Sequence, residues 1–457
     1  MTDQTPGKIA CVPSNEFMGR SLSASLSRIA DYRPPRCGFG RCFSSCASVS
    51  ANQSILRVCR LPTTMRRVLF LLGLQLLHQL RSVTAQQAQS LPSKSVTEYS
   101  LPAAAETHEI IAVNDNLLLI SQQTDGSLVK VVLDDNGRPT GSSKWQLTTP
   151  FSGLHGLVLG SNTTVWATAQ FDNVVLQVNP GENDINSAPT IVSTIPIPSP
   201  ASGPHGILVN NGNLWVTCKD SSHVVRISIA DTSDTNVYAV SGRPIFVAVH
   251  PTSNDVYASL DLSSKIWHLK SGGAAEEIDV PPSAGTTPVG LLAGPDGNAW
   301  VALLGNSTTG TGTFGRINSD ASIDWFTLTS NVGQNAGLIH IAFDTSSSRF
   351  WLLGSSTVNP SGPNAVFTVT IDPSTQGSAT GPRIAIQNTI TLPTQWSWTH
   401  RIISHGGSLY VTELTTSTLA HISGAVVNGW PVSETWDQYA DYGLGLKAAV
   451  ITYNNTI

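Results

Sequence analysis

The sequence predicts an all-β fold built from repeated four-stranded units, and two observations support this prediction. Only 12% of the 457 residues are charged, while Gly (38) and Pro (27) are frequent. This composition favours short strands joined by turns over long surface helices. A strand–turn–strand pattern also recurs every 40 to 60 residues or so, which is typical of the blades of a β-propeller. We expect about seven blades, with six as the alternative.

Seven copies of the pattern can be aligned, at Thr107–Gln122, Leu154–Gln170, Pro204–Lys219, Pro244–Asp261, Pro288–Leu304, Leu338–Ser355 and Thr399–Leu414. Their second strands share one column of large residues, namely Leu118, Trp166, Trp215, Tyr257, Trp300, Trp351 and Tyr410. We interpret this column as packing between blades. The segment 95–101 resembles a fourth strand without a blade before it, and the last repeat lacks a fourth strand. We therefore expect 95–101 to close the ring, which would remove exposed sheet edges.

The N-terminal region predicts secretion. Met65-Arg66-Arg67 precedes an apolar run of ten residues and the small residues Val83 and Ala85, which together describe a signal peptide over 65–85. Residues 1–64 carry five of the six cysteines and show no periodicity. We interpret them as a non-native or disordered extension, produced by an over-extended gene model or by a real basic segment. Residues 86–457 then form a single propeller domain.

Charge and cysteine content narrow the classes of partner. After residue 85 the chain has 14 Lys and Arg against 27 Asp and Glu, a formal charge of −13. A surface of that sign repels nucleic acid and anionic membranes, so we expect a small-molecule partner; the oligomeric state stays open.

After residue 85, Cys218 is the only cysteine left, which excludes an intrachain disulfide in that part of the chain. Three sequons predict glycosylation, at Asn162, Asn306 and Asn454.

Polar residues concentrate at one end of the repeated hairpin. The second residue of each hairpin should lie at a mouth of the central channel, where several blades can converge on one ligand. Across the blades this position holds His108, His155, His205, Ile245, Val289, Ile339 and His400. Ring closure would place the four histidines in one arc, facing an apolar side. Such a mouth would orient an amphipathic small molecule; a structural role for His155 and His205 is the alternative.

The first and last blades supply the candidate catalytic groups. Glu106 precedes His108 by two residues, and His400 lies across its own hairpin from Glu413. Two Glu/His pairs side by side suit general acid–base catalysis. His400 is the predicted base, His108 assisted by Glu106 the acid, and Glu413 would orient His400; Glu106 and Glu413 could instead hold a cation. The predicted substrate contacts are His155, His205, Ser121, Gln122, Gln170 and Trp398.

Several repeat motifs resemble the streptogramin B lyase (virginiamycin B lyase) family. They are Gly203-Pro-His-Gly-Ile207 with Asn213-Leu-Trp-Val-Thr217, and Pro288-Val-Gly-Leu-Leu with Asp296-Gly-Asn-Ala-Trp300. The resemblance covers roughly residues 95–423 and implies a seven-bladed propeller that opens a cyclic depsipeptide lactone by elimination with Mg²⁺. Glu106-Thr-His108 and His400 with Tyr410-Val-Thr-Glu413 correspond to the family's working residues. Ser121 stands where that family has a second carboxylate.

Fungal hetero-Diels–Alderase propellers offer a second resemblance, by overall type alone. They dehydrate a precursor and couple the product with a polyene, which also needs an acid and a base across an apolar surface. We therefore expect a secreted acid–base lyase or cyclase that acts on a natural product at the channel mouth. A hetero-Diels–Alderase and a non-catalytic ligand-binding propeller are the alternatives. No cofactor is predicted from the residues, and Mg²⁺ follows only from the family resemblance.

Overall fold

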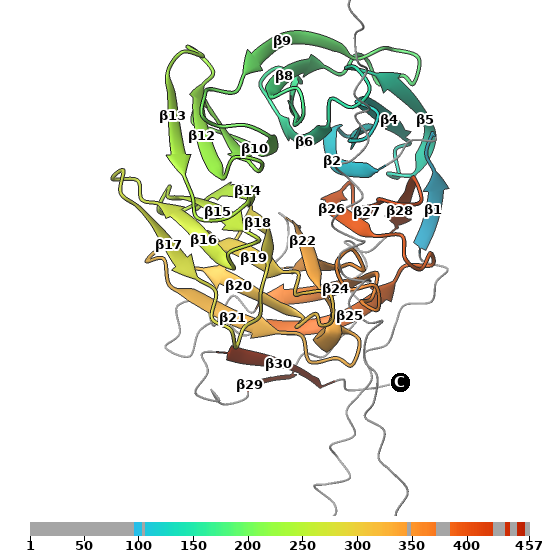
Figure 1. Cartoon of the computed structure of the whole chain (residues 1–457). Coiled ribbons are helices and arrows are strands. Elements are labelled where there is room, and N and C mark those ends of the chain that lie inside the picture. The colour runs from blue at the N-terminus through green and yellow to red at the C-terminus, as the bar shows by residue number, and fades with distance from the viewer. Residues whose placement is uncertain are drawn as a thin grey trace, which may run out of the picture. The chain divides into compact units, whose positions relative to one another are not determined.

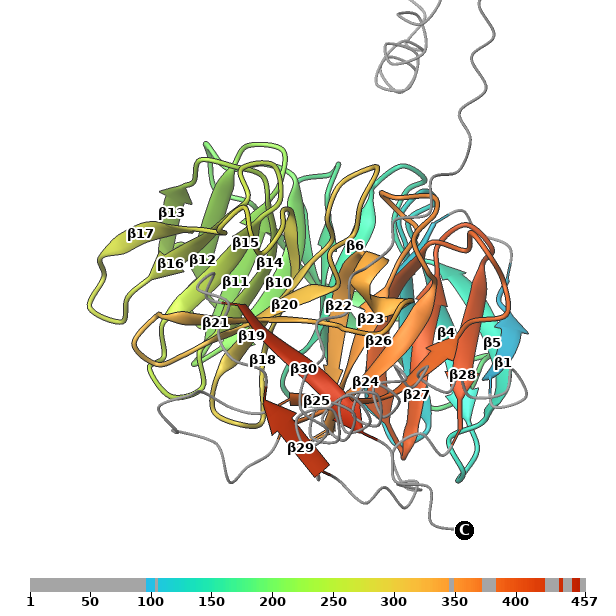
Figure 2. The ribbon, with the colours of Figure 1, turned by 90° about the horizontal axis from the view of Figure 1, so that it is seen from below.

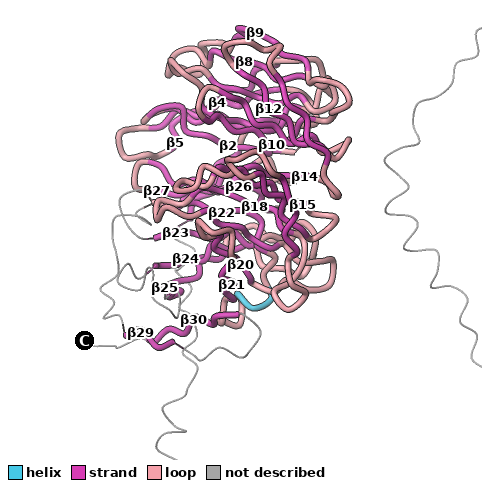
Figure 3. Tube along the Cα trace, turned by 90° about the vertical axis from the view of Figure 1, so that its left-hand side faces the viewer, coloured by secondary structure: helices cyan, strands magenta, loops and turns pink. Residues whose placement is uncertain are grey.

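The computed structural model describes residues 96–102, 106–344, 349–371 and 384–423, together with the strands at 435–438 and 446–452. Seven sheets, each built on four antiparallel strands, surround a common axis (Figure 1). Strands make up almost all of the regular structure that is described, and one short 3-10 turn, Gly333–Asn335, accompanies them (Figure 3). The predicted seven-bladed, all-β propeller is confirmed.

Each blade runs outward from an inner strand next to the axis. We number the blades 1 to 7 along the chain: β2(Thr107–Asn114), β3(Leu117–Gln122), β4(Ser127–Leu133) and β5(Pro139–Gln146); β6(Leu154–Leu159), β7(Val165–Ala169), β8(Val174–Asn179) and β9(Thr190–Pro196); β10(Pro204–Asn210), β11(Asn213–Cys218), β12(His223–Ser228) and β13(Thr235–Ala239); β14(Pro244–Val249), β15(Val256–Leu260), β16(Lys265–Leu269) and β17(Ala275–Asp279); β18(Pro288–Ala293), β19(Ala299–Leu303), β20(Thr313–Ile317) and β21(Ile323–Thr327); β22(Leu338–Phe343), β23(Arg349–Gly354), β24(Ala365–Ile371) and β25(Ile384–Thr391); and β26(Thr399–His405), β27(Ser408–Glu413), β28(Thr418–Ile422) and β1(Val96–Ser100).

The N-terminal strand closes the ring, as expected. β1 pairs antiparallel with β28, from Val96 opposite Ile422 to Ser100 opposite Thr418. Blade 7 therefore combines three strands from the end of the repeat region with one from its beginning. Blades 1 and 7 become neighbours, and the inner strands β2 and β26 lie side by side (Figure 1).

The C-terminal strands form an addition that the repeat pattern did not predict. β30(Leu446–Thr452) pairs in parallel with β21, and β29(Thr435–Gln438) pairs with β30, so the sheet of blade 5 has six strands (Figure 2). The predicted extension 1–64, the predicted signal peptide and the sequon at Asn454 lie outside the described residues. Within the described part of the chain, no helix has the length and apolar character needed to cross a bilayer.

The core lies between adjacent blades. All seven residues of the predicted column on the second strands are at most 7% exposed. Between blades 5 and 6, for example, Trp300 packs within a cluster that includes Phe314 and Phe350. The interpretation of this column as core packing is therefore confirmed.

Every inner strand carries a bulge near its start. In blade 1, Thr107 pairs with Gln122 but Ile110 pairs with Ile120, so His108 and Glu109 together lie opposite Ser121. The same register shift occurs in β6, β10, β14, β18, β22 and β26. A bulge interrupts the alternation of side chains along a strand. Two consecutive residues of each blade can then face the axis.

A hydroxyl group bridges most of these bulges to the next blade. In blade 1, the Ser121 hydroxyl accepts a hydrogen bond from the Glu109 N–H (3.1 Å) and donates one to the His155 carbonyl of blade 2 (2.6 Å). Thr168, Thr217, Ser259 and Thr412 occupy the equivalent positions and make the same pair of bonds. The bridge satisfies the N–H that the bulge frees and fixes the next inner strand. Ala302 and Leu353 stand at this position in blades 5 and 6.

Close approach between blades requires glycine after His155 and His205. A Cβ atom on Gly156 would lie 2.2 Å from the His205 carbonyl oxygen, and one on Gly206 would lie 2.4 Å from that of Ile245. Both distances are too short for any other residue without movement of the backbone. The His-Gly pairs of the sequence are thus explained by backbone contact between inner strands.

The bridge at the ring seam predicts the effect of Thr412→Val. The Thr412 hydroxyl accepts from the Arg401 N–H (3.1 Å) and donates to the His108 carbonyl (2.8 Å), so valine leaves two buried groups unpaired. We expect a loss of about 1–3 kcal/mol in the free energy of unfolding for each such group, measured by denaturant titration. Thr412→Ser keeps the hydroxyl and is the control. A Thr412→Val protein as stable as Thr412→Ser would contradict the bridge.

Candidate functional site

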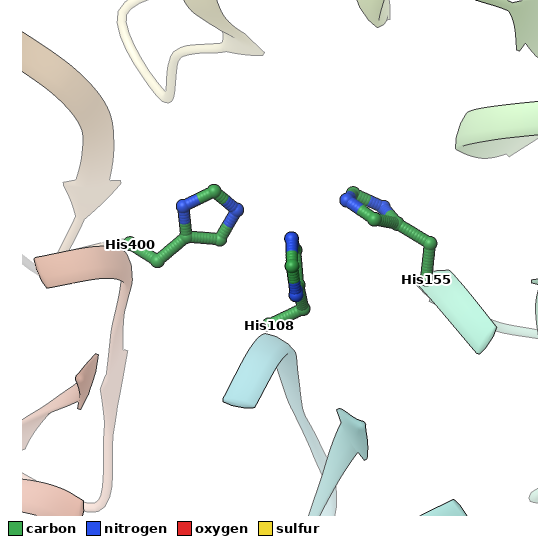
Figure 4. Close-up of side chains that lie close together, drawn as sticks. All are labelled: His108, His155 and His400. Atoms are coloured by element: carbon green, nitrogen blue, oxygen red, sulfur yellow. The ribbon is translucent and has the colours of Figure 1, made fainter. Parts of the chain in front are cut away.

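Four histidines from four inner strands meet near the axis, and we call them the histidine cluster. The ring centroids of His108 and His155 are 4.4 Å apart, those of His108 and His400 are also 4.4 Å apart, and those of His155 and His205 are 3.7 Å apart. Figure 4 shows three of these rings converging from β2, β6 and β26. Ring closure therefore brings His108 and His400 together, although 292 positions separate them.

Main-chain carbonyls define the tautomer of two cluster members. His108 Nδ1 lies 3.1 Å from the Glu106 carbonyl oxygen, and His205 Nδ1 lies 3.2 Å from that of Ile245. A carbonyl only accepts hydrogen bonds, so each Nδ1 carries the proton and each Nε2 has the lone pair. These two imidazoles can accept a proton or coordinate an ion through Nε2.

Other nitrogens of the cluster have no hydrogen-bond partner among the described protein residues. This applies to both ring nitrogens of His400 and to Nδ1 of His155, all of which are buried. His155 as a whole is 1% exposed. An unpaired buried polar group costs about 1–3 kcal/mol, so a folded protein that keeps several in one place calls for a functional explanation.

Burial keeps the cluster uncharged. Desolvation is the main reason why the pKa of His108 falls to about 3, and Arg401 and Lys219 lower it further. Desolvation also holds the pKa values of His155, His205 and His400 well below their usual range, with added repulsion from Arg401. Neutral imidazoles are the form that accepts protons and binds metal ions.

A second layer beside the cluster comes from the second bulge residue of blades 1, 4, 6 and 7, namely Glu109, Phe246, His340 and Arg401. Arg401 Nε lies 2.9 and 3.0 Å from the two carboxylate oxygens of Glu109, and its guanidinium carbon is 4.3 Å from the Phe246 ring centre. His340 also contacts that ring, with centroids 5.3 Å apart. Sequence reasoning missed this layer because strand alternation points the residue after each histidine away from the axis, whereas the bulge turns it inward.

The Glu109–Arg401 pair links blades 1 and 7, and its removal should be costly. Arg401 is 1% exposed and Glu109 is 9% exposed. Glu109→Ala leaves the guanidinium buried without its counter-charge, and we expect a loss of about 3–5 kcal/mol in the free energy of unfolding. The exposed pair Arg226–Asp234 is the control, since Asp234→Ala should cost less than about 1 kcal/mol. Equal effects of the two substitutions would refute the buried pair's importance.

The two predicted catalytic carboxylates do not lie where strand alternation suggested. Glu106 has a left-handed backbone (φ 64°), its side chain is exposed, and it reaches His108 only through its carbonyl oxygen. Glu413 is fully buried, with Oε2 accepting from the Thr418 hydroxyl (2.5 Å) and Oε1 without a partner among the described residues, while Thr412 next to it faces blade 1. Successive strand residues face opposite ways, so Glu413 points away from that seam. Its expected role in orienting His400 is therefore not supported.

The remaining predicted contacts are divided between structural and exposed positions. Ser121 is committed to its bridge, and Gln122 is buried with its Oε1 accepting from the Thr107 hydroxyl (3.3 Å). Gln170 donates to Asp220 (3.1 Å), in the loops at the end of the ring where the inner strands begin. Trp398 is 39% exposed there, and its left-handed backbone (φ 51°) matches that of Glu106 in the equivalent position of blade 1.

That end of the ring, which we call the histidine mouth, collects exposed apolar side chains. The loops that precede the inner strands or follow the second strands expose Phe151, Phe171, Leu262, Val332, Trp396 and Trp398. Three other large apolar residues are exposed in the described chain, on β6 and β9. The three apolar residues at the histidine position of blades 4, 5 and 6, Ile245, Val289 and Ile339, are buried within one core cluster. Exposed apolar groups concentrated around polar nitrogens are typical of a binding site.

The donors of the cluster do not fit Mg²⁺. Magnesium requires oxygen ligands, mainly carboxylates, phosphates and water, whereas the cluster offers imidazole nitrogens. The Glu106 side chain is exposed, and Glu413 follows Thr412, which faces blade 1, so its carboxylate points away from the cluster. The Mg²⁺ chemistry that the family resemblance implies therefore has no set of ligands among the described residues of this site.

Buried neutral histidines should make the fold sensitive to acid, and His340 tests this outside the cluster. Burial and the neighbouring Arg401 hold the pKa of His340 well below its usual value. The unfolded chain then binds more protons below about pH 6.5, so stability is full above that pH and falls as the pH drops. We expect His340→Gln to reduce the slope of unfolding free energy against pH, between pH 6.5 and 5, by up to about 1.4 kcal/mol per pH unit.

Denaturant titrations at several pH values measure that slope. Ile341→Val, at a neighbouring buried position, is the control: it should lower stability by about 0.5–1.5 kcal/mol without changing the slope. If His340→Gln leaves this slope unchanged, the pKa of His340 is the same in the folded and the unfolded protein.

Comparison with known proteins supports the fold. No protein-family profile matches the sequence, and no curated protein sequence does. Among solved structures, a streptogramin B lyase is 20% identical over 71% of this chain and 96% of its own, with a TM-score of 0.54. A catalytically inactive variant of virginiamycin B lyase from Staphylococcus aureus, solved with quinupristin, is 16% identical over 72% of this chain and 98% of its own (TM-score 0.55). YCF48 bound to a D1 peptide is 15% identical, over 75% of this chain and 100% of its own (TM-score 0.52).

Proposed function

We propose that this protein is a small-molecule lyase or cyclase that acts on a largely apolar natural product at the histidine mouth. The observation that carries the proposal is the convergence of four uncharged imidazoles, several of whose nitrogens lack a protein partner. The likeness to lyase propellers supports the fold on which this reaction would take place.

The proposed reaction is an elimination or dehydration. A carbon-bound proton passes to an imidazole lone pair, the electron pair forms a double bond, and the carbon–oxygen bond breaks. The leaving oxygen then needs a hydrogen-bond donor or another electrophile. The tautomer makes His108 the proton acceptor through Nε2, so His400 is left as the donor, which reverses the roles expected from the sequence.

The apolar rim supports the substrate class. Trp396 and Trp398 are 68% and 39% exposed, and Phe151 is 76% exposed. These side chains would cover the hydrocarbon part of a substrate whose reacting carbon–oxygen bond lies against the imidazoles. The dehydration step of a hetero-Diels–Alder coupling fits the same arrangement, and we keep that reaction as a special case of the proposal.

A secretory route also belongs to the proposal. The predicted signal peptide supports it, and two sequon asparagines, Asn162 and Asn306, lie in exposed turns of blades 2 and 5. Both are sterically open to glycosylation.

Two variants, one with two substitutions and one with a single substitution, test the function together with one ligand panel. The full chain is incubated with lactone and β-hydroxy natural products, and product formation and ligand binding are both measured. We expect His108→Ala/His400→Ala to lose turnover by at least about 100-fold while binding stays within a few-fold. Trp398→Ala should weaken binding of the same ligand, because it removes apolar contact area.

Leu159→Ala, an exposed apolar change at the opposite end of β6, is the matched control and should alter neither quantity. Ligand binding by a wild-type protein that converts no member of the panel would favour a non-catalytic binding propeller. Turnover that survives the double substitution would place the reaction elsewhere.

A further inference from the structure

We propose that His108, His155 and His400 form a binding site for a divalent transition-metal ion of the Zn²⁺ class. One nitrogen from each side chain can be chosen so that all three lie within 4.8 Å of one another. Figure 4 shows the rings directed toward a common point. The three ligands come from blades 1, 2 and 7, so the site exists only in the closed ring.

The spacing requires only small movements for coordination. Zn–N bonds of about 2.0–2.1 Å in tetrahedral geometry place ligand nitrogens about 3.4 Å apart. Rotation of the side chains closes the remaining distance. His400 breaks no hydrogen bond when it turns, since neither of its nitrogens has a partner among the described residues.

The chemistry of the donors selects the class of ion. Neutral imidazole nitrogens suit zinc, copper, iron, nickel and related ions, whereas magnesium and calcium require oxygen. His108 also shows the second-shell contact typical of metal ligands, because its Nδ1–H donates to the Glu106 carbonyl and leaves Nε2 for the ion. Nδ1 of His155, a residue that is 1% exposed, is a further nitrogen without a partner at the site.

Charge around the site does not exclude a cation. Arg401 lowers the pKa of every cluster member, and Lys219 lowers the pKa of His108, His155 and His205. Glu109 balances Arg401 through the two contacts described above, and the carboxylates of Asp220 and Asp261 act on Lys219 by raising its pKa. The Arg401 N–H and guanidinium are further tied to Thr412 and to the His400 carbonyl (3.0 Å), which fix their position. The second layer is thus close to net neutral.

The catalytic consequence rests on the proposed function. An ion with three protein ligands keeps at least one position for a substrate oxygen, as catalytic zinc sites do. When bound there, the ion would supply a Lewis acid that stabilises the negative charge on the leaving oxygen, which keeps the electron pair of the carbon–oxygen bond. With the ion bound, His108 Nε2 would be a ligand and could not act as the base, so His205 would take its place as acceptor of the carbon-bound proton. The Nδ1 of His205 contacts the Ile245 carbonyl, which leaves the lone pair on Nε2, and its ring lies 3.7 Å from that of His155.

Metal binding is tested first without any substrate. Full-length protein is stripped with chelator, dialysed against Zn²⁺ or Co²⁺ at pH 7.5, and analysed for bound metal, for cobalt d–d absorption and for the metal-induced shift in Tm. We expect one equivalent of either ion, and none of Mg²⁺ under the same conditions. His400→Ala and His155→Ala should each weaken Zn²⁺ binding by at least about 100-fold.

Two controls keep the result interpretable. His405→Ala removes a half-buried imidazole of the same inner strand that bonds the Asp115 carbonyl, and it should bind zinc as the wild type does. The metal-free Tm of His400→Ala should match that of the wild type, which shows that the variant folds. A wild-type protein that retains no ion, or variants that keep full stoichiometry and affinity, would overturn the site.

The two proposals fail separately. Zinc binding without conversion of any substrate would leave the metal site in place and reject the proposed lyase. Turnover by the metal-free protein at the wild-type rate would support the lyase and reject the catalytic ion.

Discussion

The packing of the inner strands and the geometry of the candidate site depend on one extra residue near the start of each inner strand. The bulge frees a backbone N–H in every blade, and in five blades a Ser or Thr hydroxyl accepts from it and donates to the next blade. One side-chain oxygen thereby satisfies local backbone and sets the distance between neighbouring inner strands. The same bulge turns two successive residues toward the axis, and both layers of the site follow from it.

The seam between blades 1 and 7 combines such a hydroxyl bridge with a buried ion pair. Thr412 bridges to the His108 carbonyl, and Arg401 pairs with Glu109 beside it. Both contacts join parts of the chain about 300 residues apart, so they cannot stabilise the fold before the ring closes. The candidate site lies on this seam. Its geometry is therefore a consequence of closure, and an open ring would separate His108 from His400.

Residue periodicity was sufficient to predict the propeller, its closing strand and the histidine arc, because each rests on repeated spacing. His108, His155, His205 and His400 occupy one repeat position, and the structure brings their rings together. The partners of these histidines could not be predicted, because they depend on backbone geometry that the pattern does not encode. The left-handed turn at Glu106 and the bulge before Arg401 reverse what simple alternation implies. The strands after residue 434 belong to no repeat and had no signal of their own.

The low pKa values of the cluster histidines distinguish two kinds of catalyst. One works by proton transfer between side chains, and the other works through an electrophile that the imidazoles hold. An imidazole that stays neutral because it is buried is a weak base, and it is not available as an imidazolium acid near neutral pH. A mechanism that needs strong proton transfer would gain from carboxylates beside the rings, yet Glu106 is exposed and Glu413 is bonded to Thr418. Burial does favour the coordination of a metal ion. A nitrogen that binds a metal must be unprotonated, and the bound ion offsets the free energy lost by burying that nitrogen without a hydrogen-bond partner. The distribution of charge around the cluster is thus better matched to an electrophile held by imidazoles than to a chain of ionised acid and base.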